Sequence, residues 1–387
     1  MVVYPLVINF ASDVFTGWGC VGMNWAGLLE PEFQPLFGTV PTPNHFVGMD
    51  PLRYRSIERA INASRAWKYT PECIWVDPIG NDLKSYSDVD PKCLIARVII
   101  EKADMKQAME RLAKYDLLLT GSTWNQERIE SATGRKVKII HEGIDPSLFC
   151  PGEKSGWNRT FNVFSSGKVE FRKAQDVTLM AFKRFAERHE DARLITLWNS
   201  PYADLGNGYK GIADAPLWLD ASEKLDVKRW AHDNGIDASK VTELGNIPNF
   251  ALPQILREMD VMLAPTRVES CTSLPVKEAM ACGLPVIYAH HSGMRDLPTR
   301  IDFGHYPISM PLTGCKPIHA SSEYFFPLAD WEWYEPDLDE IDSQLEWAYQ
   351  NREKARTMGL QASSWVHQHR TWRFHVEHLK AWLKEVL

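Results

Sequence analysis

The chain has 387 residues, a formal net charge of −7 and 44% hydrophobic residues. This length exceeds what one hydrophobic core holds, so the sequence predicts two domains, and its acidic balance gives no overall basic field for nucleic acid or an anionic membrane. Seven scattered Cys, with no CxxC pair, argue against a disulfide framework or a zinc site and fit a reducing cytoplasm.

The first predicted element is a β-strand within MVVYPLVINF, which ends near Phe10. Its apolar run is about half the length of a membrane span. No basic region of the kind that opens a signal peptide precedes it. We therefore expect no transmembrane segment and a cytoplasmic protein, with peripheral contact to a membrane left open.

A glycine-rich stretch follows this strand. Gly17, Gly19 and Gly22 match the dinucleotide-binding fingerprint letter for letter, which raises the alternative of an NAD(P)-dependent oxidoreductase. Two observations count against it. About six residues separate the strand from the first glycine, and the next strand-like run, Phe33 to Val40, is followed by no acidic residue for a ribose.

Residues 45 to 120 alternate helix-like and strand-like runs, with the last strand at Leu117 to Thr120. Such alternation predicts a parallel sheet. Asp88-Val89-Asp90 and Asp337-Leu338-Asp339 have the spacing of a metal-binding DxD motif. The first lies in a turn-rich run, SYSDVDP, and we interpret both as solvated turns, so no metal site is predicted.

A run rich in Pro, Gly and polar residues, Phe149 to Arg159, predicts a hinge. We therefore place an N-terminal domain at residues 1–155 and a C-terminal domain at residues 156–365, and the family resemblance described below implies that both are Rossmann-like. Residues 366–387 form a separate final helix, because apolar residues recur on one of its faces from Trp372 to Val386.

The second domain is predicted to open with a strand, Phe161 to Ser165, that leads through a turn into an amphipathic helix. Three cations occupy this turn: Lys168, Arg172 and Lys173. Cations here suit a diphosphate, because fixed positive charge stabilises the negative charge on phosphate oxygens. A solvated basic turn is the alternative.

The stretch from Glu243 to Leu297 predicts a strand, a small-residue turn at 270–273, a helix at Pro275 to Cys282 and a second strand. A helix that begins behind such a turn offers unpaired N–H groups to a phosphate. Glu278, expected in the first helical turn, would accept hydrogen bonds from sugar or ribose hydroxyls. Its alternative role is only to complement the helix dipole.

Glu269 and Glu278, followed by AMACGLPVI, resemble the Glu-x7-Glu signature of retaining GT-B glycosyltransferases of the GT4-like family, the glycosyl transferases group 1. Here eight residues separate the two Glu, and Ser270 to Pro275 stands in place of Gly-Phe-Gly-Leu-Pro with one residue more. Gly167-Lys168 and Lys173-Ala174 resemble the Gly-Arg…Lys-Gly pair of the family, with Ala174 in place of the second glycine.

The resemblance implies an α/β GT-B fold, with two Rossmann-like doubly wound domains that face a cleft and a last helix that packs back on the N-terminal domain. It implies a retaining hexosyltransferase that moves a sugar from a UDP- or GDP-sugar to an acceptor hydroxyl without a metal. The nucleotide sugar is a co-substrate, and no cofactor is expected. The acceptor stays open between a saccharide, a lipid-linked glycan, a small molecule and, least favoured, a nucleic acid. The oligomeric state is left open too.

The resemblance also assigns site residues. Glu101, after the strand RVII, falls where relatives place a residue near the reacting sugar, although a surface carboxylate or a helix cap is an equal alternative. Relatives place the nucleobase at Asn246 and Ile247, and a glycine loop after the first strand between donor and acceptor. The expected catalytic residues are Lys168, Lys173, Glu269 and Glu101. The expected donor-binding residues are Gly17, Gly19, Arg172, Asn246, Ile247, Cys271, Thr272, Ser273, Leu274 and Glu278.

One alternative comes from a non-enzyme class. The longer spacing between Glu269 and Glu278, together with Ala174 in place of glycine, is also consistent with a catalytically degenerate GT-B scaffold that binds a partner or a sugar. Nucleotide-sugar hydrolysis separates this scaffold from an active transferase.

Overall fold

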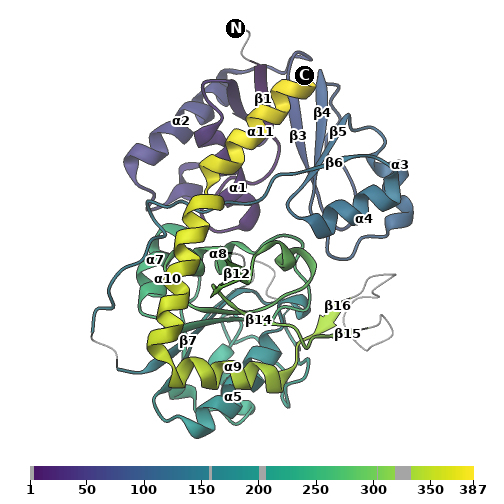
Figure 1. Cartoon of the computed structure of the whole chain (residues 1–387). Helices are drawn as coiled ribbons and strands as arrows, with labels where there is room; N and C mark the ends of the chain where they lie inside the picture. Colours follow the sequence, from purple (N-terminus) through teal and green to yellow (C-terminus); the bar gives the residue numbers. More distant parts are fainter. Residues whose placement is uncertain (1–3, 157–158, 200–205, 303, 319–332) are drawn as a thin grey trace.

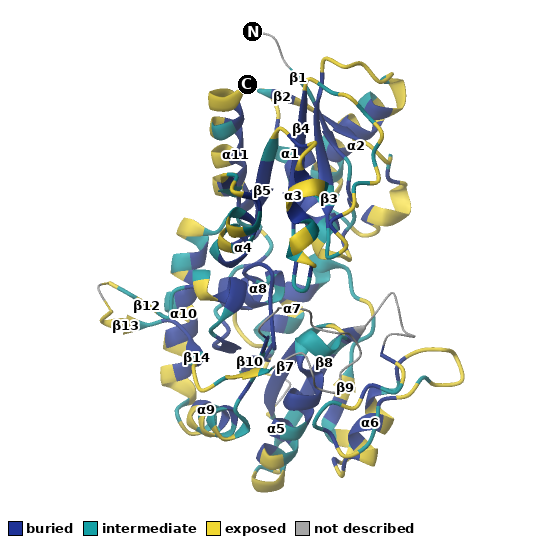
Figure 2. Ribbon diagram, turned by 90° about the vertical axis from the view of Figure 1, so that its right-hand side faces the viewer, coloured by how far each residue is buried: buried dark blue, intermediate teal, exposed yellow. Residues whose placement is uncertain are grey.

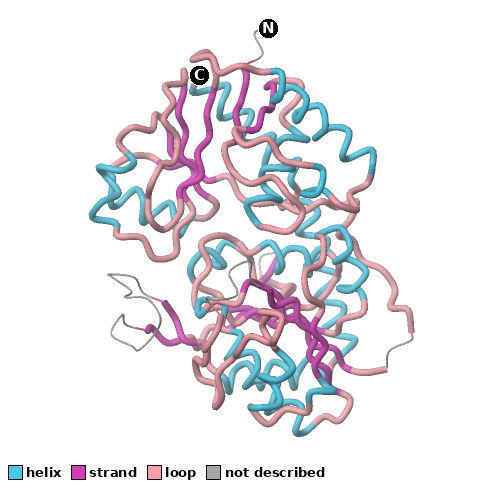
Figure 3. Tube along the Cα trace, turned by 180° about the vertical axis from the view of Figure 1, so that it is seen from behind, coloured by secondary structure: helices cyan, strands magenta, loops and turns pink. Residues whose placement is uncertain are grey.

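The structure is a computed structural model, and it describes residues 4–156, 159–199, 206–302, 304–318 and 333–387. Two lobes lie one above the other, and each contains its own sheet (Figures 1 and 3). The predicted fold class, α/β with two doubly wound domains, is therefore confirmed.

The first lobe is built on a six-stranded sheet of order β2-β1-β3-β4-β5-β6, in which every pairing is parallel. Leu6, Val7 and Ile8 of β1 are fully buried, as expected for a strand covered on both faces. The strands are β1 (Tyr4–Ile8), β2 (Phe33–Phe37), β3 (Ile74–Ile79), β4 (Cys93–Val98), β5 (Leu117–Thr120) and β6 (Val137–Ile139). The helices are α1 (Gly17–Leu28), α2 (Pro51–Ala66), α3 (Ala108–Leu112) and α4 (Thr123–Thr133).

The second lobe repeats this plan, with a parallel sheet of order β14-β11-β10-β7-β8-β9. Its strands are β7 (Phe161–Lys168), β8 (Ala192–Asn199), β9 (Val241–Glu243), β10 (Val261–Ala264), β11 (Val286–Ala289) and β14 (Met310–Leu312). Its helices are α5 (Gln175–Arg188), α6 (Val227–Asp233), α7 (Leu252–Arg257), α8 (Leu274–Ala281) and α9 (Leu338–Gln350). Two small hairpins, β12 (Arg300–Ile301) with β13 (Tyr306–Pro307) and β15 (Lys316–Ile318) with β16 (Trp333–Glu335), complete the lobe.

The last two helices connect the lobes. α10 (Arg352–His369) packs against α8, whereas α11 (Trp372–Val386) buries Val376, Leu379 and Leu383 in the core of the first lobe. Where α10 passes into α11, Thr371 forms a β-bridge with Ile144, which lies in the segment that leads from β6 to the second lobe. The chain thus passes between the lobes twice, in the segment after β6 and at the junction of α10 and α11 (Figure 1), and the β-bridge joins these two crossings. Within the described residues, no helix is both long enough and apolar enough to traverse a bilayer.

The structure corrects the expectation of a glycine loop after β1. Gly17, Gly19 and Gly22 all lie in α1, and the loop is formed by residues 9–16, with Thr16 as the N-cap. A Cβ atom at Gly19 would lie 2.4 Å from the Asp13 carboxyl group, and one at Gly22 would lie 2.3 Å from Ser12 Oγ. These two glycines let the loop fold closely over the start of the helix, which accounts for them without a dinucleotide.

Candidate functional site

The two lobes meet at the loop between β10 and α8. Ser122 Oγ donates to the Ser270 carbonyl at 2.6 Å, and Asn125 Nδ2 donates to the same oxygen at 3.1 Å. A Cβ atom at Gly121 would lie 2.4 Å from Cys271 Sγ, so this glycine allows the close approach. Figure 2 shows α8 as a buried helix at the junction of the lobes.

The loop presents backbone N–H groups at the start of α8. Pro275 lies in the first turn, as predicted, and the helix begins at Leu274. Within the described part of the chain, the N–H groups of 271–274 have no hydrogen-bond acceptor. Unpaired N–H groups at the positive end of a helix favour an anion. Thr272 is fully buried and Cys271 is 5% exposed, whereas Ser273 is partly exposed, so the loop is partly covered in this structure.

The cationic turn reaches the same loop. It consists of the end of β7 and the short helix η3 (Phe171–Lys173). Lys173 Nζ donates to Glu269 Oε1, and Arg172 Nη1 lies 3.3 Å from Glu269 Oε2. The predicted cations and the predicted anion-binding loop, which are about 100 residues apart in sequence, therefore converge on Glu269.

A buried arginine holds the turn and the loop together. Arg267, at the start of the loop, donates its N–H to the Arg172 carbonyl at 2.8 Å. Its guanidinium is fully buried and pairs with Asp176 at 2.6 Å and Glu335 at 2.7 Å. Because Asp176 lies in the first turn of α5, this network fixes the turn relative to β10.

Glu101 comes from the first lobe and joins the same cluster. Its carboxylate accepts a hydrogen bond from Ser270 Oγ at 3.0 Å and one from Asn81 Nδ2 at 2.9 Å, and it lies 3.7 Å from Arg172 Nη1. Trp333 Nε1 donates to the Glu101 carbonyl at 3.1 Å. Glu101 thus links the first lobe to the loop before α8 and to the cationic turn.

The cluster balances three cations with three carboxylates: Lys168, Arg172 and Lys173 with Glu101, Glu170 and Glu269. Burial opposes the charge of Lys173 and lowers its pKa, even though Glu269 lies beside it. Burial also opposes ionisation of Glu170, but Arg172 and Lys168 prevail and lower its pKa to about 2. Any anion that binds Lys173 must therefore compete with Glu269.

Lys168 and the two residues predicted to hold the nucleobase lie at the periphery of this cluster. The Lys168 side chain is 44% exposed and pairs with Glu170 at 3.1 Å. Asn246 and Ile247 follow β9 in a loop, with Asn246 exposed. Gly17 lies near the start of α8, because a Cβ atom built at Gly17 would lie 3.9 Å from Leu274 Cδ1.

Glu278 departs from its predicted place. It lies in the second turn of α8 rather than the first, because the helix begins at Leu274, and it is 5% exposed. Asn249 Nδ2 donates to its Oε1 at 2.6 Å. Burial raises the pKa of Glu278 to about 7, although this hydrogen bond acts in the opposite direction. Asn249 also lines a cavity of about 310 Å3 between the lobes, together with Val14, Met49 and Phe250.

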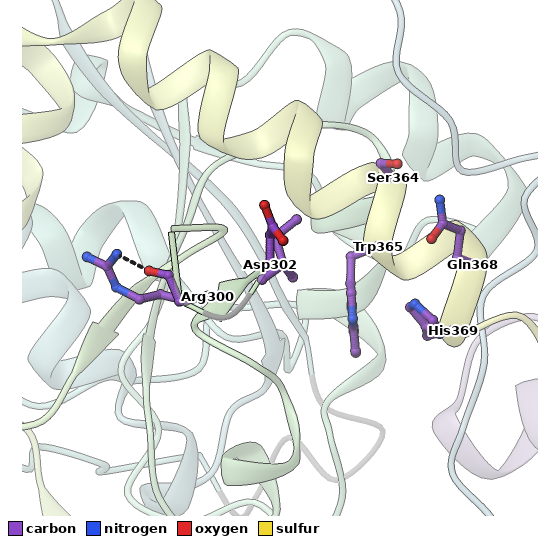
Figure 4. A pocket seen from close by; sticks show the side chains of 8 residues that line it. Arg300, Asp302, Ser364, Trp365, Gln368 and His369 are labelled. Atoms are coloured by element: carbon purple, nitrogen blue, oxygen red, sulfur yellow. Dashed lines mark hydrogen bonds between the residues drawn. The ribbon is translucent and has the colours of Figure 1, made fainter. Parts of the chain in front are cut away.

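A larger cavity lies elsewhere. It measures about 560 Å3 and is lined by the end of α10, including Trp365 and His369, and by Asp302 beyond β12 (Figure 4). None of the predicted site residues lines it. We therefore do not assign the candidate site to this cavity, although it is the larger of the two. Among the described residues, no group of three or more His, Cys, Asp or Glu side chains has the arrangement of a metal site.

The sequence analysis missed a buried ion pair behind the loop. Lys277 is fully buried and lies 3.6 Å from Glu142, which is itself 3.4 Å from Arg97 of β4. One signal was present in the sequence. Lys277 interrupts an otherwise apolar or small-residue helix face, and a lysine in such a place needs a buried partner.

Ala174 and Ser273 both occupy left-handed backbone conformations, with φ of 56° and 50°. These are positions where the resemblance places glycine. A side chain in this region costs about 1–2 kcal/mol. We expect Ala174→Gly to raise the free energy of unfolding by up to about 1 kcal/mol, because glycine relieves the strain but loses more chain entropy. Urea unfolding measures it.

Ala181→Gly is the matched control. Ala181 lies inside α5, where glycine is unfavourable, and this variant should lose at least about 1 kcal/mol. Equal losses from both variants would contradict the strain at Ala174.

Comparison with known proteins matches residues 160–301 to the model of a family described as glycosyl transferases group 1. This part of the second lobe is therefore similar to glycosyl transferases group 1. The matched residues contain both the cationic turn and the loop before α8. The predicted resemblance is confirmed.

Curated relatives share the same region. A D-inositol 3-phosphate glycosyltransferase from Stackebrandtia nassauensis is 28% identical over 209 residues, which cover 50% of this chain and 42% of the relative. The enzyme of the same name from Mycobacteroides abscessus is 27% identical over 173 residues, which cover 43% of this chain and 34% of the relative. The match thus spans less than half the length of these relatives.

Solved structures resemble the whole chain. Sucrose-phosphate synthase from Thermosynechococcus elongatus superposes with a TM-score of 0.67 at 14% identity and covers 99% of this chain and 98% of its own. HepE from Anabaena, in complex with UDP and glucose, gives 0.63 at 13% identity, with 100% of both chains covered. At such identities the likeness concerns the fold, and it confirms the GT-B architecture.

Proposed function

We propose that this chain transfers a sugar from a UDP- or GDP-sugar to an acceptor hydroxyl with retention of configuration. Protein cations and backbone amides, rather than a metal ion, hold the diphosphate. The observation that carries the proposal is the convergence of Lys173 and Arg172 with the unpaired N–H groups of 271–274 beside Glu269. The curated relatives are glycosyltransferases by name, and a structural neighbour binds UDP and glucose, which supports the same donor class.

In this proposal the diphosphate lies against the N–H groups of 271–274, with Lys173 and Arg172 on its other side. The bond between the sugar and the phosphate oxygen breaks, and the acceptor oxygen forms a bond to the same carbon on the same face. Negative charge grows on the leaving phosphate, and fixed cations stabilise that change most strongly. The leaving oxygen takes the proton of the acceptor hydroxyl, so no separate general base is needed.

The carboxylates have separate roles. Once the diphosphate attracts Lys173, Glu269 is released to accept a hydrogen bond from a sugar hydroxyl. Glu101 approaches the same sugar from the first lobe. Glu278 accepts hydrogen bonds from the ribose, and its link to Asn249 at 2.6 Å holds it in place.

A thermal-shift panel tests the proposal. We expect UDP or GDP to raise the melting temperature, because a ligand at 100 times its Kd stabilises the folded state by about 2.7 kcal/mol. A rise with NAD(P) and none with UDP or GDP would favour the oxidoreductase alternative instead. Hydrolysis of the best nucleotide sugar then separates an active transferase from a binding scaffold.

A further inference from the structure

Lys277 makes three polar contacts from a fully buried position on α8. Its ammonium donates to Thr272 Oγ1 at 2.7 Å and to the Glu142 carbonyl at 2.9 Å, and it lies 3.6 Å from Glu142 Oε2. An ammonium group has three donors, so these contacts satisfy it. Lys277 therefore links the loop before α8 to the segment that joins the lobes.

Glu142 connects this lysine to the first lobe. Its side chain is 12% exposed, and its carboxylate lies 3.4 Å from Arg97 Nη2 and accepts a hydrogen bond from the Cys271 thiol. The Arg97 guanidinium in turn lies 4.8 Å from the ring centroid of Trp18 in α1. One carboxylate thus contacts side chains of both lobes.

The stability of the fold does not by itself explain the buried pair of Lys277 and Glu142. Burial lowers the pKa of Lys277 to about 8, against the attraction of Glu142, so the charged lysine is costly in this place. Apolar side chains of similar volume often replace a buried ion pair without loss of stability. The contact with Thr272 is what an apolar residue at position 277 would lose.

We propose that Lys277 and Glu142 are positioning residues for a nucleoside diphosphate bound at the loop before α8. Lys277 fixes Thr272, whose N–H is one of those directed at the diphosphate. Glu142 fixes Lys277 relative to the segment between the lobes, so the geometry of the loop depends on how the lobes meet. This inference rests on the proposed function for its ligand, but the restraint on the loop exists without the ligand.

The first measurement concerns the loop in the ligand-free protein. We expect Lys277→Met to speed hydrogen exchange at the amides of 271–274 and Lys277→Arg to restore part of the protection, because arginine keeps both the charge and donors. Lys380→Met is the matched control. Lys380 lies on α11 and is also buried, at 4% exposure. It pairs at 3.0 Å with Glu377 of the same helix and with Glu32 before β2, so its loss should leave loop exchange unchanged.

The second measurement concerns UDP and GDP binding and turnover of the matching nucleotide sugar. We expect Lys277→Met to lower kcat by about 10²-fold with a smaller change in KM, since a small misplacement of a catalytic group has effects of this size. Glu142→Gln should show the same trend more weakly, because the Glu142 carbonyl remains. If Lys277→Met does not fold, Glu142→Gln takes its place as the test variant.

The outcomes separate this inference from the proposed function. Wild-type loop exchange in folded Lys277→Met, or in Glu142→Gln if the first variant does not fold, would overturn the inference. So would an unchanged kcat in the same variant. Faster loop exchange in the variant, with no binding of UDP or GDP by the wild type, would support the restraint by Lys277 and overturn the donor assignment instead.

Discussion

Lys173→Met should lower kcat for sugar transfer by about 10²- to 10³-fold, the cost of removing one fixed donor from a developing negative charge. The proposed mechanism places the Lys173 ammonium on the leaving diphosphate, where its charge matters more in the transition state than in the ground state. Steady-state kinetics with the best nucleotide sugar measures the effect, and KM should change less than kcat.

The same variant should remain folded. Removing Lys173 leaves Glu269 with Arg172 at 3.3 Å, so the carboxylate keeps a cationic partner. Lys183→Met is the control, because Lys183 lies on α5 with a half-buried side chain and pairs only loosely with Asp214, at 3.6 Å. Normal turnover of Lys173→Met, or an equal loss in the control, would refute the assigned role.

Glu278→Gln should stabilise the ligand-free protein and weaken its binding of UDP or GDP. The folded-state pKa of Glu278 is raised by burial to about 7 from an ordinary value near 4.5. The folded state then holds this proton more tightly than the unfolded state does. Stability is full below the unfolded pKa and falls as pH rises to about 7, by about 3 kcal/mol. Gln at this position avoids that loss.

Donor binding should show the opposite pH dependence. The ribose hydroxyls need the ionised carboxylate, so affinity for UDP or GDP in the wild type should rise as pH increases through about 7. In Glu278→Gln the affinity should be at least about tenfold lower, which is 1.4 kcal/mol, and flat across this range. Thermal melts and titration calorimetry from pH 5.5 to about 8.5 cover both effects.

Glu346→Gln provides a contrast in sign. The hydrogen bond from His189 lowers the pKa of Glu346, so its ionised form stabilises the folded state, and the Gln variant should be no more stable than the wild type near neutral pH. If Glu278→Gln lowers the melting temperature near neutral pH, as Glu346→Gln is expected to do, the raised pKa of Glu278 is wrong.

The sequence predicted what depends on neighbours along the chain. The strand at Val261–Ala264, the small-residue turn and the helix predicted at Pro275 to Cys282 are each set by residues within a few positions. The structure contains all three, with the helix at Leu274–Ala281. The sequence pattern was less informative for Gly17 to Gly22. A glycine that permits close packing within a helix cannot be told by its identity alone from a glycine that lines a loop.

The contacts that complete the site could not be predicted in this way. Ser270 meets Glu101 across 169 residues, and Lys277 meets Glu142 across 135. The sequence separation of neither pair indicates a contact, because only the tertiary fold brings the residues together. The resemblance placed Glu101 near the sugar, but it gave no indication of Glu142. Only the burial of Lys277 revealed that partner.

The β-bridge between Ile144 and Thr371 has a consequence for how the molecule admits its substrate. Both chain crossings pass through this one point, and a Cβ atom at Gly143 would lie 2.3 Å from the Trp372 nitrogen, so the crossings have no room to slide past each other. We therefore expect the lobes to part by rotation about this point rather than by sliding. Under the proposed function, the extent of that rotation sets how far the loop at 271–274 is open to a donor.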